Sequence, residues 1–308
     1  MAMTGVSPQS EALAGGLARD LLTSLRPDQW TKNLIVFAGL VFSEQLFTPA
    51  ATARSSGTFV IFCALSSAMY LVNDLRDRSR DRLHPGKATR PIADGRVPAT
   101  VAFSLAGLLL ASGISGAFLL GPRLGVVALS FAGLLSLYTL VLQEIVILDV
   151  LTIATGFVLR AVAGAVALAV PISQWLLVCT LLLALFLALT KRRQEVVALG
   201  AAAAKHRPSL GRYSTGVLDQ MVTIVAGATL VSYAVYTTGA ETAGNFETNL
   251  LTLTIPFPIY GVLRYLMLVH DDRSDPGPSD ILLRDRPLAL CVVGWGLSVA
   301  VIIYRPFG

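Results

Sequence analysis

The chain has 308 residues, of which 54% are hydrophobic and only 14% are charged, and its mean hydropathy is +0.68. This composition excludes an ordinary water-soluble domain, because such domains carry about 25% charged residues. The net charge of +5 does not indicate nucleic-acid binding, since no basic run is interleaved with aromatic residues as a groove for single strands requires. The expected solvent of this chain is the lipid bilayer.

Nine apolar stretches of about the length of a membrane-spanning helix follow one another along the chain. They are rich in Leu and Ala and lack the two-residue alternation of strands, so we expect an all-α, polytopic bundle of nine transmembrane helices. The stretches cover residues 30–47, 58–71, 99–120, 124–142, 147–170, 175–189, 221–239, 250–269 and 288–304.

Most of the 24 Lys and Arg residues lie in the N-terminal segment or in loops on its side of the bundle. Cytoplasmic loops carry such an excess. We therefore expect a multi-pass protein of the plasma membrane with a cytoplasmic N-terminus and no removable signal peptide. The expected organisation is a cytoplasmic segment over residues 1–28 and a transmembrane domain over residues 29–308, with cytoplasmic loops at 72–98, 190–219 and 270–287.

The first candidate site follows the second stretch, where residues 73–81 read Asn-Asp-Leu-Arg-Asp-Arg-Ser-Arg-Asp. If the helix continues, Asp74, Asp77 and Asp81 stand at i, i+3 and i+7 and share one face. Carboxylates that converge repel one another unless a cation lies between them, and hard oxygen ligands suit Mg²⁺. We therefore predict a Mg²⁺ site formed by these residues with Asn73.

Basic residues follow the acidic ones in the same loop. Arg82, Lys87 and Arg90 are candidates to hold phosphate oxygens. His84 is either a ligand or proton donor, or a surface residue. The structural alternative for the whole segment is a solvated loop of mixed charge, which the helical spacing and the position at a membrane edge disfavour.

The second candidate cluster comprises Tyr138, Gln143, Asp149 and Arg160, before and on the fifth stretch. Asp149 and Arg160 are three helical turns apart and so lie on one face. An ionisable residue inside a span is a functional-site hypothesis by default. The alternative is an internal salt link or a residue that extends to the interface, and Gly156 and Gly164 on the same helix indicate close helix packing.

A third set of polar residues lies at the ends of other stretches. It comprises Lys32, Asn33, the run Lys191-Arg192-Arg193-Gln194-Glu195, Arg264, Asp280 and Asp285. Each cation taken alone is also explained as a topology anchor.

Signatures of other chemistries are absent from the sequence. It contains no phosphate-binding P-loop, dinucleotide fingerprint, zinc-protease motif or serine nucleophile elbow. Cys63, Cys179 and Cys291 are far apart and within apolar stretches, which indicates packing residues rather than a metal or redox site. A transporter is expected to place charges at broken helices near the midplane, whereas here the charges collect at the cytoplasmic ends and favour chemistry on a water-soluble substrate.

Taken together, the nine stretches and the Asn-Asp-x-x-Asp-x-x-x-Asp motif resemble the UbiA-type superfamily of membrane transferases. Within it, the chain is most similar to the decaprenyl-phosphate phosphoribosyltransferases. The strings that carry this resemblance cover most of the chain in order, at residues 26–33, 73–91, 149–164, 191–195, 263–265 and 283–286.

The resemblance implies transfer of 5-phosphoribosyl from phosphoribosyl diphosphate (PRPP) to a polyprenyl phosphate in arabinan precursor synthesis for the cell wall, with release of diphosphate. It assigns Asn73, Asp74, Asp77 and Asp81 to Mg²⁺ and the diphosphate, and Asp149 to a second acidic element. The candidate substrate-binding residues are Lys32, Asn33, Arg82, His84, Lys87, Arg90, Tyr138, Gln143, Arg160, Lys191, Arg192 and Arg264. A homo-oligomer is compatible with the sequence.

One position departs from the pattern of that family. Gln143 stands where the family has Lys, six residues before Asp149. A phosphate contact there is therefore weakened, or is supplied by another cation such as Lys32 or Lys191. Two alternatives remain open: a polyprenyltransferase of the same superfamily that acts on an aromatic or other lipid-soluble acceptor, and a transporter or lipid flippase.

Overall fold

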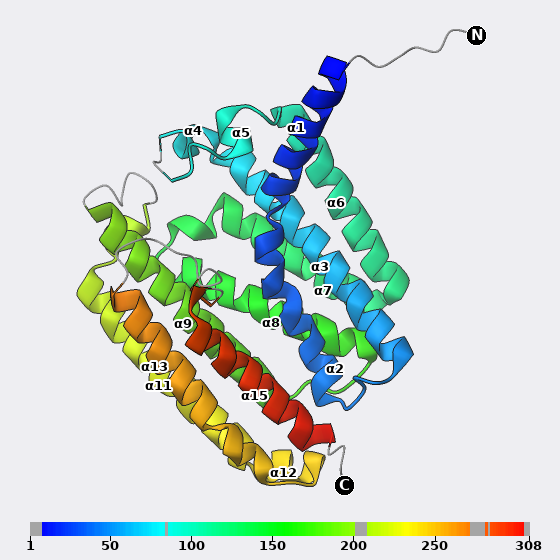
Figure 1. Cartoon of the computed structure of the whole chain (residues 1–308), viewed down its shortest axis with the longest axis vertical. Coiled ribbons are helices and arrows are strands. Elements are labelled where there is room, and N and C mark those ends of the chain that lie inside the picture. The colour runs from blue at the N-terminus through cyan, green and yellow to red at the C-terminus, as the bar shows by residue number, and fades with distance from the viewer. Residues whose placement is uncertain (1–7, 84–85, 201–207, 272–280, 283, 305–308) are drawn as a thin grey trace. The chain divides into compact units, whose positions relative to one another are not determined.

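The computed structural model describes residues 8–83, 86–200, 208–271, 281–282 and 284–304 (Figure 1). Within these ranges all regular elements are helices, which confirms the all-α prediction. In this described part of the chain, eight segments are helical, long and apolar enough to cross a membrane. They are α3 (Pro49–Arg76), α6 (Ala99–Leu120), α7 (Pro122–Leu140), α8 (Leu148–Leu168), α9 (Gln174–Leu199), α11 (Thr215–Thr238), Leu250–His270 and α15 (Arg286–Tyr304).

Shorter helices connect the long ones or precede them. They are α1 (Pro8–Leu25), η1 (Pro27–Phe37), α2 (Ala38–Phe42), α4 (Arg78–Asp81), α5 (Pro91–Asp94), η2 (Leu142–Glu144), η4 (Leu210–Arg212) and α12 (Ala240–Phe246). The segment Leu250–His270 consists of η5 (Leu250–Thr254) and most of α13 (Pro256–Asp271).

The long helices expose a large apolar surface. Only 17% of the most apolar stretch of α6 is buried inside the protein, and Phe103 and Leu119 on this helix are 70% and 88% exposed. Contiguous apolar surface of this extent is rare on soluble monomers. The chain is therefore an integral, multi-pass membrane protein.

The expected first span, residues 30–47, is not one regular helix. It is formed by the 3₁₀-helix η1 and the short α2, so a ninth spanning helix is not confirmed in the described part of the chain. Close packing on α8 accounts for the irregular path: a Cβ atom on Gly164 would lie 2.0 Å from the carbonyl oxygen of Val36, and one on Gly39 would lie 2.9 Å from the amide nitrogen of Ala165. The packing role expected for Gly164 is confirmed.

The expected second span, residues 58–71, is shorter than the helix that contains it. The helix α3 begins at Pro49, and polar residues of its first turns are satisfied by hydrogen bonds within the protein. Thr52 donates to the carbonyl oxygen of Leu46 at 3.0 Å, and Arg54 donates to that of Ala167 at 2.9 Å. These polar residues lowered the hydropathy on which the expected boundary depended.

The chain divides into two compact units. Unit 1 takes residues from 1–32 and 60–132, and unit 2 takes residues from 33–59 and 133–308. In unit 1, α1 places Leu17, Leu21 and Leu25 at four-residue spacing against a buried core. That core consists of Leu71, Ile92, Val97, Ala102 and Ala106.

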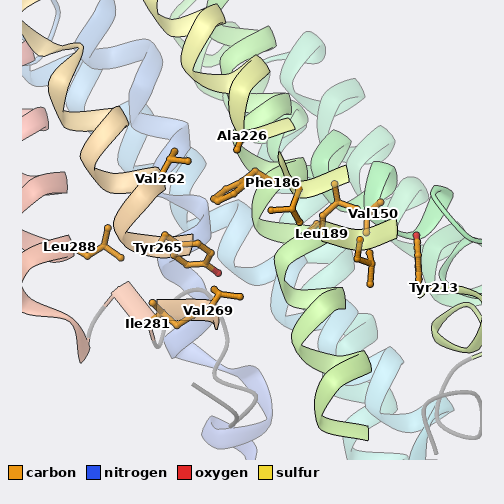
Figure 2. Close-up of a cluster of buried hydrophobic side chains, with 13 residues drawn as sticks. Val150, Phe186, Leu189, Tyr213, Ala226, Val262, Tyr265, Val269, Ile281 and Leu288 are labelled. Carbon is orange, nitrogen blue, oxygen red and sulfur yellow. The ribbon is translucent and has the colours of Figure 1, made fainter. Parts of the chain in front are cut away.

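Unit 2 has a larger core, formed where α9 packs against α8 and α11, with α13 and α15 adding further side chains. Figure 2 shows Phe186 and Leu189 of α9 facing residues from the neighbouring helices, among them Tyr265 of α13. The rings of Phe186 and Tyr265 meet edge to face, with centroids 5.5 Å apart. This core fixes the C-terminal half of α9, which carries Arg192.

None of the three cysteines, all of which lie in the described residues, forms a disulfide bond. Cys63 is buried, while Cys179 and Cys291 are half-buried. This agrees with the prediction that they are packing residues.

Candidate functional site

The acidic motif of unit 1 lies where α3 ends and α4 begins. Asp74 and Asp81 are buried, with side chains only 4% and 7% exposed. One guanidinium nitrogen of Arg90, Nη1, donates to Oδ1 of Asp74 at 3.1 Å and to Oδ2 of Asp81 at 2.7 Å. The motif therefore brings two carboxylates together around one cation.

The described structure brings two of the three predicted carboxylates together, and no three His, Cys, Asp or Glu side chains of the described residues are grouped closely enough to share a metal ion. The break between α3 and α4 at Asp77 gives the reason. Its ψ angle is 5°, whereas a regular helix has about −42°. The backbone hydrogen bonds from Asp77 to Asn73 and from Asp81 to Asp77 persist, so Asp74 and Asp81 remain close while the regular spacing is lost at Asp77.

Arg26 is a member of this cluster that the sequence reasoning missed as a site residue. Its Nη2 atom donates to Oδ1 of Asp74 at 2.5 Å, and its guanidinium lies 4.8 Å from the ring centroid of Tyr70. Its φ angle is +54°, a strained value for a residue with a side chain. Ser67 holds the turn, because its hydroxyl donates to the carbonyl of Leu25 and accepts from the indole of Trp30.

The general excess of arginine in the N-terminal segment and in the loops assigned to its side hid Arg26 as a site residue. The signals that distinguish it are its position directly before Pro27, its closeness to Trp30, and its place at the start of the string 26–33 that carries the family resemblance.

The donor set of this cluster fits a divalent ion of the Mg²⁺ type. Such ions bind through one or two carboxylates and complete their shell with water and substrate phosphates. Asp74 and Asp81 supply two carboxylates that already face one cationic nitrogen, and Arg90 is 27% exposed and so reachable from solvent. Asn73 and Asp77 lie half-buried beside them in sequence.

The other described candidates of this loop, Arg82 and Lys87, have hydrogen bonds that involve the backbone beside the site. Arg82 donates from Nε to the carbonyl of Ala93 at 2.7 Å and so ties α4 to α5. The carbonyl of Lys87 accepts from the amide of Arg90 at 3.0 Å, which helps to position Arg90. His84 lies outside the described residues. Of the predicted cations, the structure brings Arg90 to the carboxylates.

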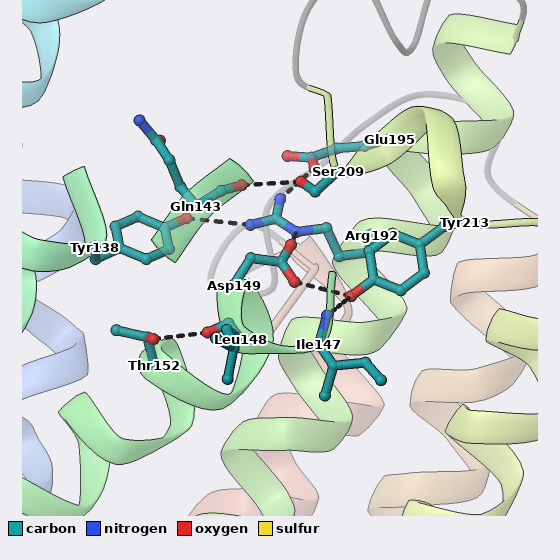
Figure 3. Close-up of polar contacts among 10 residues, drawn as sticks. All are labelled: Tyr138, Gln143, Ile147, Leu148, Asp149, Thr152, Arg192, Glu195, Ser209 and Tyr213. Atoms are coloured by element: carbon teal, nitrogen blue, oxygen red, sulfur yellow. Dashed lines mark hydrogen bonds and ion pairs between the residues drawn. The ribbon is translucent and has the colours of Figure 1, made fainter. Parts of the chain in front are cut away.

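The second cluster lies in unit 2 and is centred on Asp149 at the start of α8 (Figure 3). Asp149 is fully buried, and both of its oxygens are engaged. Oδ2 accepts from Nε of Arg192 at 2.8 Å, and Oδ1 accepts from the hydroxyl of Tyr213 at 2.8 Å. Arg192, itself only 3% exposed, also forms an ion pair with Glu195 and donates to the hydroxyl of Tyr138 at 3.2 Å.

The turn before α8 contains a residue with a strained backbone angle, and hydrogen bonds from residues elsewhere in the chain hold it in place. Ile147 has a φ angle of +71°, an outlier for a β-branched residue. Its amide donates to the hydroxyl of Tyr213 at 2.8 Å, and the hydroxyl of Ser209 donates to the carbonyl of Gln143 at 2.9 Å. Burial raises the pKa of Tyr213 above its ordinary value, so the phenol stays protonated at neutral pH.

Sequence reasoning missed Tyr213 and Ser209 as members of this cluster, and it named Glu195 in the third set without connecting it to Asp149. Tyr213 lies 64 residues beyond Asp149 in a polar loop, and no spacing rule connects the two. Gln143 is buried, and its side-chain amide donates to the carbonyl of Thr139 at 2.9 Å instead of facing Arg192 (Figure 3).

Arg160 does not pair with Asp149, although the two residues were expected on one face of the helix. Its Nε atom donates to Oδ1 of the buried Asn33 at 2.6 Å, and Nη1 donates to the carbonyl of Gly156 at 2.9 Å. The guanidinium also lies 5.2 Å from the ring centroid of Phe157. Two predicted residues that are 127 positions apart in the sequence, Asn33 and Arg160, thus meet inside unit 2.

The remaining candidates are placed less specifically. Arg264 forms a two-pronged ion pair with Asp285, with its Nη2 atom 2.8 Å from Oδ2, and this hydrogen bonding lowers the pKa of Asp285 below its ordinary value. Lys32 lies in η1, and Lys191 is half-buried on α9.

Comparison with known proteins agrees with the fold and the motifs. A model of the UbiA prenyltransferase family matches residues 33–279. The chain is 34% identical to the decaprenyl-phosphate phosphoribosyltransferase of Mycolicibacterium smegmatis, over 99% of both chains, and 32% identical to that of Mycobacterium tuberculosis, over 92% of this chain and 94% of the relative.

Among solved structures, a UbiA homologue from Archaeoglobus fulgidus bound to DMAPP and Mg²⁺ matches with a TM-score of 0.66 and 17% identity. The match covers 92% of this chain and 99% of that one. At this identity the likeness concerns the fold.

Proposed function

The chain belongs to the UbiA prenyltransferase family, and from that premise we propose that it transfers 5-phosphoribosyl from PRPP to a polyprenyl phosphate, releasing diphosphate. The acceptor is a lipid of the plasma membrane, and the reaction takes place at the cytoplasmic face, where most basic residues lie. A product of this kind serves as a precursor of cell-wall arabinan.

The observation that carries the proposal is the similarity, over 99% of both chains, to a relative named for this activity. A second argument comes from charge. A prenyl diphosphate brings one anionic group, whereas this reaction brings a diphosphate, a 5-phosphate and a lipid phosphate together. Guanidinium groups pair well with phosphates, and the described clusters contain Arg26, Arg90, Arg160 and Arg192.

In unit 1, Asp74 and Asp81 would hold Mg²⁺, with Asn73 and Asp77 as further oxygen donors. When bound, the ion would stabilise the charge that develops on the departing diphosphate. Arg26 orients the carboxylate of Asp74 through its 2.5 Å contact. Arg90 is the residue best placed to bind a diphosphate oxygen, with Lys87 and Arg82 in the same loop.

In unit 2, we assign Asp149 the role of positioning Arg192. Both carboxylate oxygens of Asp149 are occupied by Arg192 and Tyr213. Removing one partner from such a buried pair typically costs about 3–5 kcal/mol, so the arrangement is held firmly. Arg192 would then make the phosphate contact that relatives with Lys at this position would make through it, because this chain has Gln143 there. Lys32, Asn33, Tyr138, Gln143, Arg160, Lys191, Arg264 and His84 remain candidate substrate-binding residues.

The reaction needs no strong general base, because the lipid phosphate is already ionised at neutral pH. One of its oxygens forms a bond to C1 of the ribose, and the bond from C1 to the diphosphate oxygen breaks, with the electron pair leaving on diphosphate. Attack from the face opposite the leaving group inverts C1 and gives a β-linked product. The protein's task is to neutralise and orient anions.

The proposal is tested by incubating membranes that contain the protein with PRPP labelled in the ribose and with polyprenyl phosphate. We expect label to enter the lipid fraction in the presence of Mg²⁺ and to stay out of it when the metal is chelated. Asp81→Asn should lower the rate at least about 100-fold, whereas Arg123→Gln at the opposite membrane face should leave it unchanged. If wild-type membranes label no lipid, the proposal fails.

A further inference from the structure

We propose that Arg90 occupies the metal position between Asp74 and Asp81 until diphosphate arrives, so that the divalent ion binds together with diphosphate and not alone. The inference rests on the metal–diphosphate site of the proposed function, but it does not depend on which group is transferred. It assigns Arg90 two successive partners, the carboxylates first and the diphosphate second.

The contacts of Arg90 carry the first step. A single nitrogen, Nη1, bonds Oδ1 of Asp74 and Oδ2 of Asp81, at 3.1 and 2.7 Å. A divalent ion that bridged the same two oxygens would have to take the place of this nitrogen. Arg90 stands directly before α5, as its N-cap residue.

The charge balance carries the second step. Two guanidiniums, those of Arg26 and Arg90, already contact the carboxylates of Asp74 and Asp81. A divalent ion added without an anion would create an excess of positive charge among mostly buried groups, which is unfavourable at short range. A diphosphate removes this excess, since it supplies negative charge to the metal and a new partner to Arg90.

The difference in exposure explains why Arg90 is the group that moves. Its side chain is 27% exposed, while those of Asp74 and Asp81 are 4% and 7% exposed. Arg26 is fixed more firmly, because its turn is anchored through Ser67. The carboxylates and Arg26 thus form a fixed frame, and Arg90 is the exchangeable cation.

The test measures metal binding directly, without turnover. Purified protein in detergent is dialysed to equilibrium against radioactive Mn²⁺, with and without inorganic diphosphate, and protein-bound Mn²⁺ is counted. Arg90→Gln removes the competing charge. Arg96→Gln is the matched control, since Arg96 lies in the same loop but pairs with Asp94 and Asp20. Arg90→Met, which keeps an apolar stem, is the second variant should the first fail to fold.

We expect Arg90→Gln to bind Mn²⁺ alone at least about tenfold more tightly than wild type, while Arg96→Gln behaves like wild type. Diphosphate should increase Mn²⁺ binding strongly in wild type and much less in Arg90→Gln. Adding Asp81→Asn should abolish the gain. Equal or weaker binding of Mn²⁺ alone by Arg90→Gln and Arg90→Met, or a gain that survives Asp81→Asn, would overturn the inference.

Failure of this inference is distinct from failure of the proposed function. Wild-type protein that transfers no phosphoribosyl would refute the proposed reaction but would leave the Mn²⁺ measurement valid, because that measurement uses neither ribose nor lipid acceptor.

Discussion

At the residue scale, single hydroxyl and guanidinium groups hold the candidate site in place. The hydroxyl of Tyr213 accepts from the amide of Ile147 and donates to Asp149, so one atom ties a strained turn to a buried carboxylate. Arg192 then occupies the other oxygen of Asp149. A strained turn persists only where surrounding contacts hold it in that conformation. The two hydrogen bonds of the Tyr213 hydroxyl are such contacts.

Tyr213→Phe is therefore expected to lower the free energy of unfolding by about 1–3 kcal/mol, because it leaves a buried amide and a carboxylate oxygen without a partner. Thermal melting of the purified protein checks this, with Tyr260→Phe at a 47% exposed position as the control. Burial raises the pKa of Tyr213, so its contribution is present in full below about pH 10 and is lost only as pH rises further. The difference from wild type should thus be constant from about pH 6 to about pH 9; a difference that vanishes within this range contradicts the account.

The residues of the site were predictable to an uneven degree. Asp74, Asp81 and Arg90 follow from spacing and charge within one loop, and the structure brings them together. Asp149 and Arg192 were both candidates, but nothing in the sequence pairs them. Tyr213 was missed because it lies in a polar loop that no spacing rule connects to Asp149. Arg26 was missed because arginine is abundant in its part of the sequence, so its specific contact with Asp74 could not be anticipated.

At the element scale, hydropathy predicts a regular first span, but the structure has an irregular helical segment there. The segment is irregular because Val36–Gly39 packs closely against α8. Hydropathy reads only apolar content, whereas the path of this segment is set by backbone contact at Gly164 and Gly39. The same limitation shortened the predicted α3, whose first turns are polar but internally satisfied. Helix type and order were predictable, and irregular backbone was not.

Gly164→Ala is expected to destabilise the protein by about 1–3 kcal/mol or more, since the new methyl group would meet the backbone oxygen of Val36 at 2.0 Å. Gly133→Ala is the matched control, because nothing lies within 4 Å of its added Cβ atom. That change should be neutral or stabilising by up to about 1 kcal/mol, from the better helix propensity of Ala. Equal melting temperatures for the two variants would exclude close packing at Gly164.

At the scale of the whole molecule, the helices present apolar surface to lipid, and the sequence predicts that most basic residues lie on one side of the membrane. The positive-inside rule then predicts that α4 faces the cytoplasm and that the start of α7 faces the opposite side. In a variant without Cys63, Cys179 and Cys291, a cysteine at Ser79 should react with an impermeant maleimide only in inside-out vesicles.

The matching reporter is Arg123→Cys, which lies at the start of α7 in the same unit. It should react only in right-side-out vesicles. Both positions are exposed, so failure to react reflects sidedness and not burial. Labelling of Ser79→Cys from outside would place the acidic motif away from a cytoplasmic substrate and would contradict the proposed orientation.

Competition between PRPP and a prenyl diphosphate tests most directly which group the protein transfers. Purified wild-type protein receives Mg²⁺, polyprenyl phosphate, an aromatic acceptor, and equal concentrations of PRPP and a prenyl diphosphate, and the lipid products are identified by mass spectrometry. We predict a single product in which polyprenyl phosphate has gained one phosphoribosyl group. A prenylated aromatic product, with polyprenyl phosphate unchanged, would contradict the account.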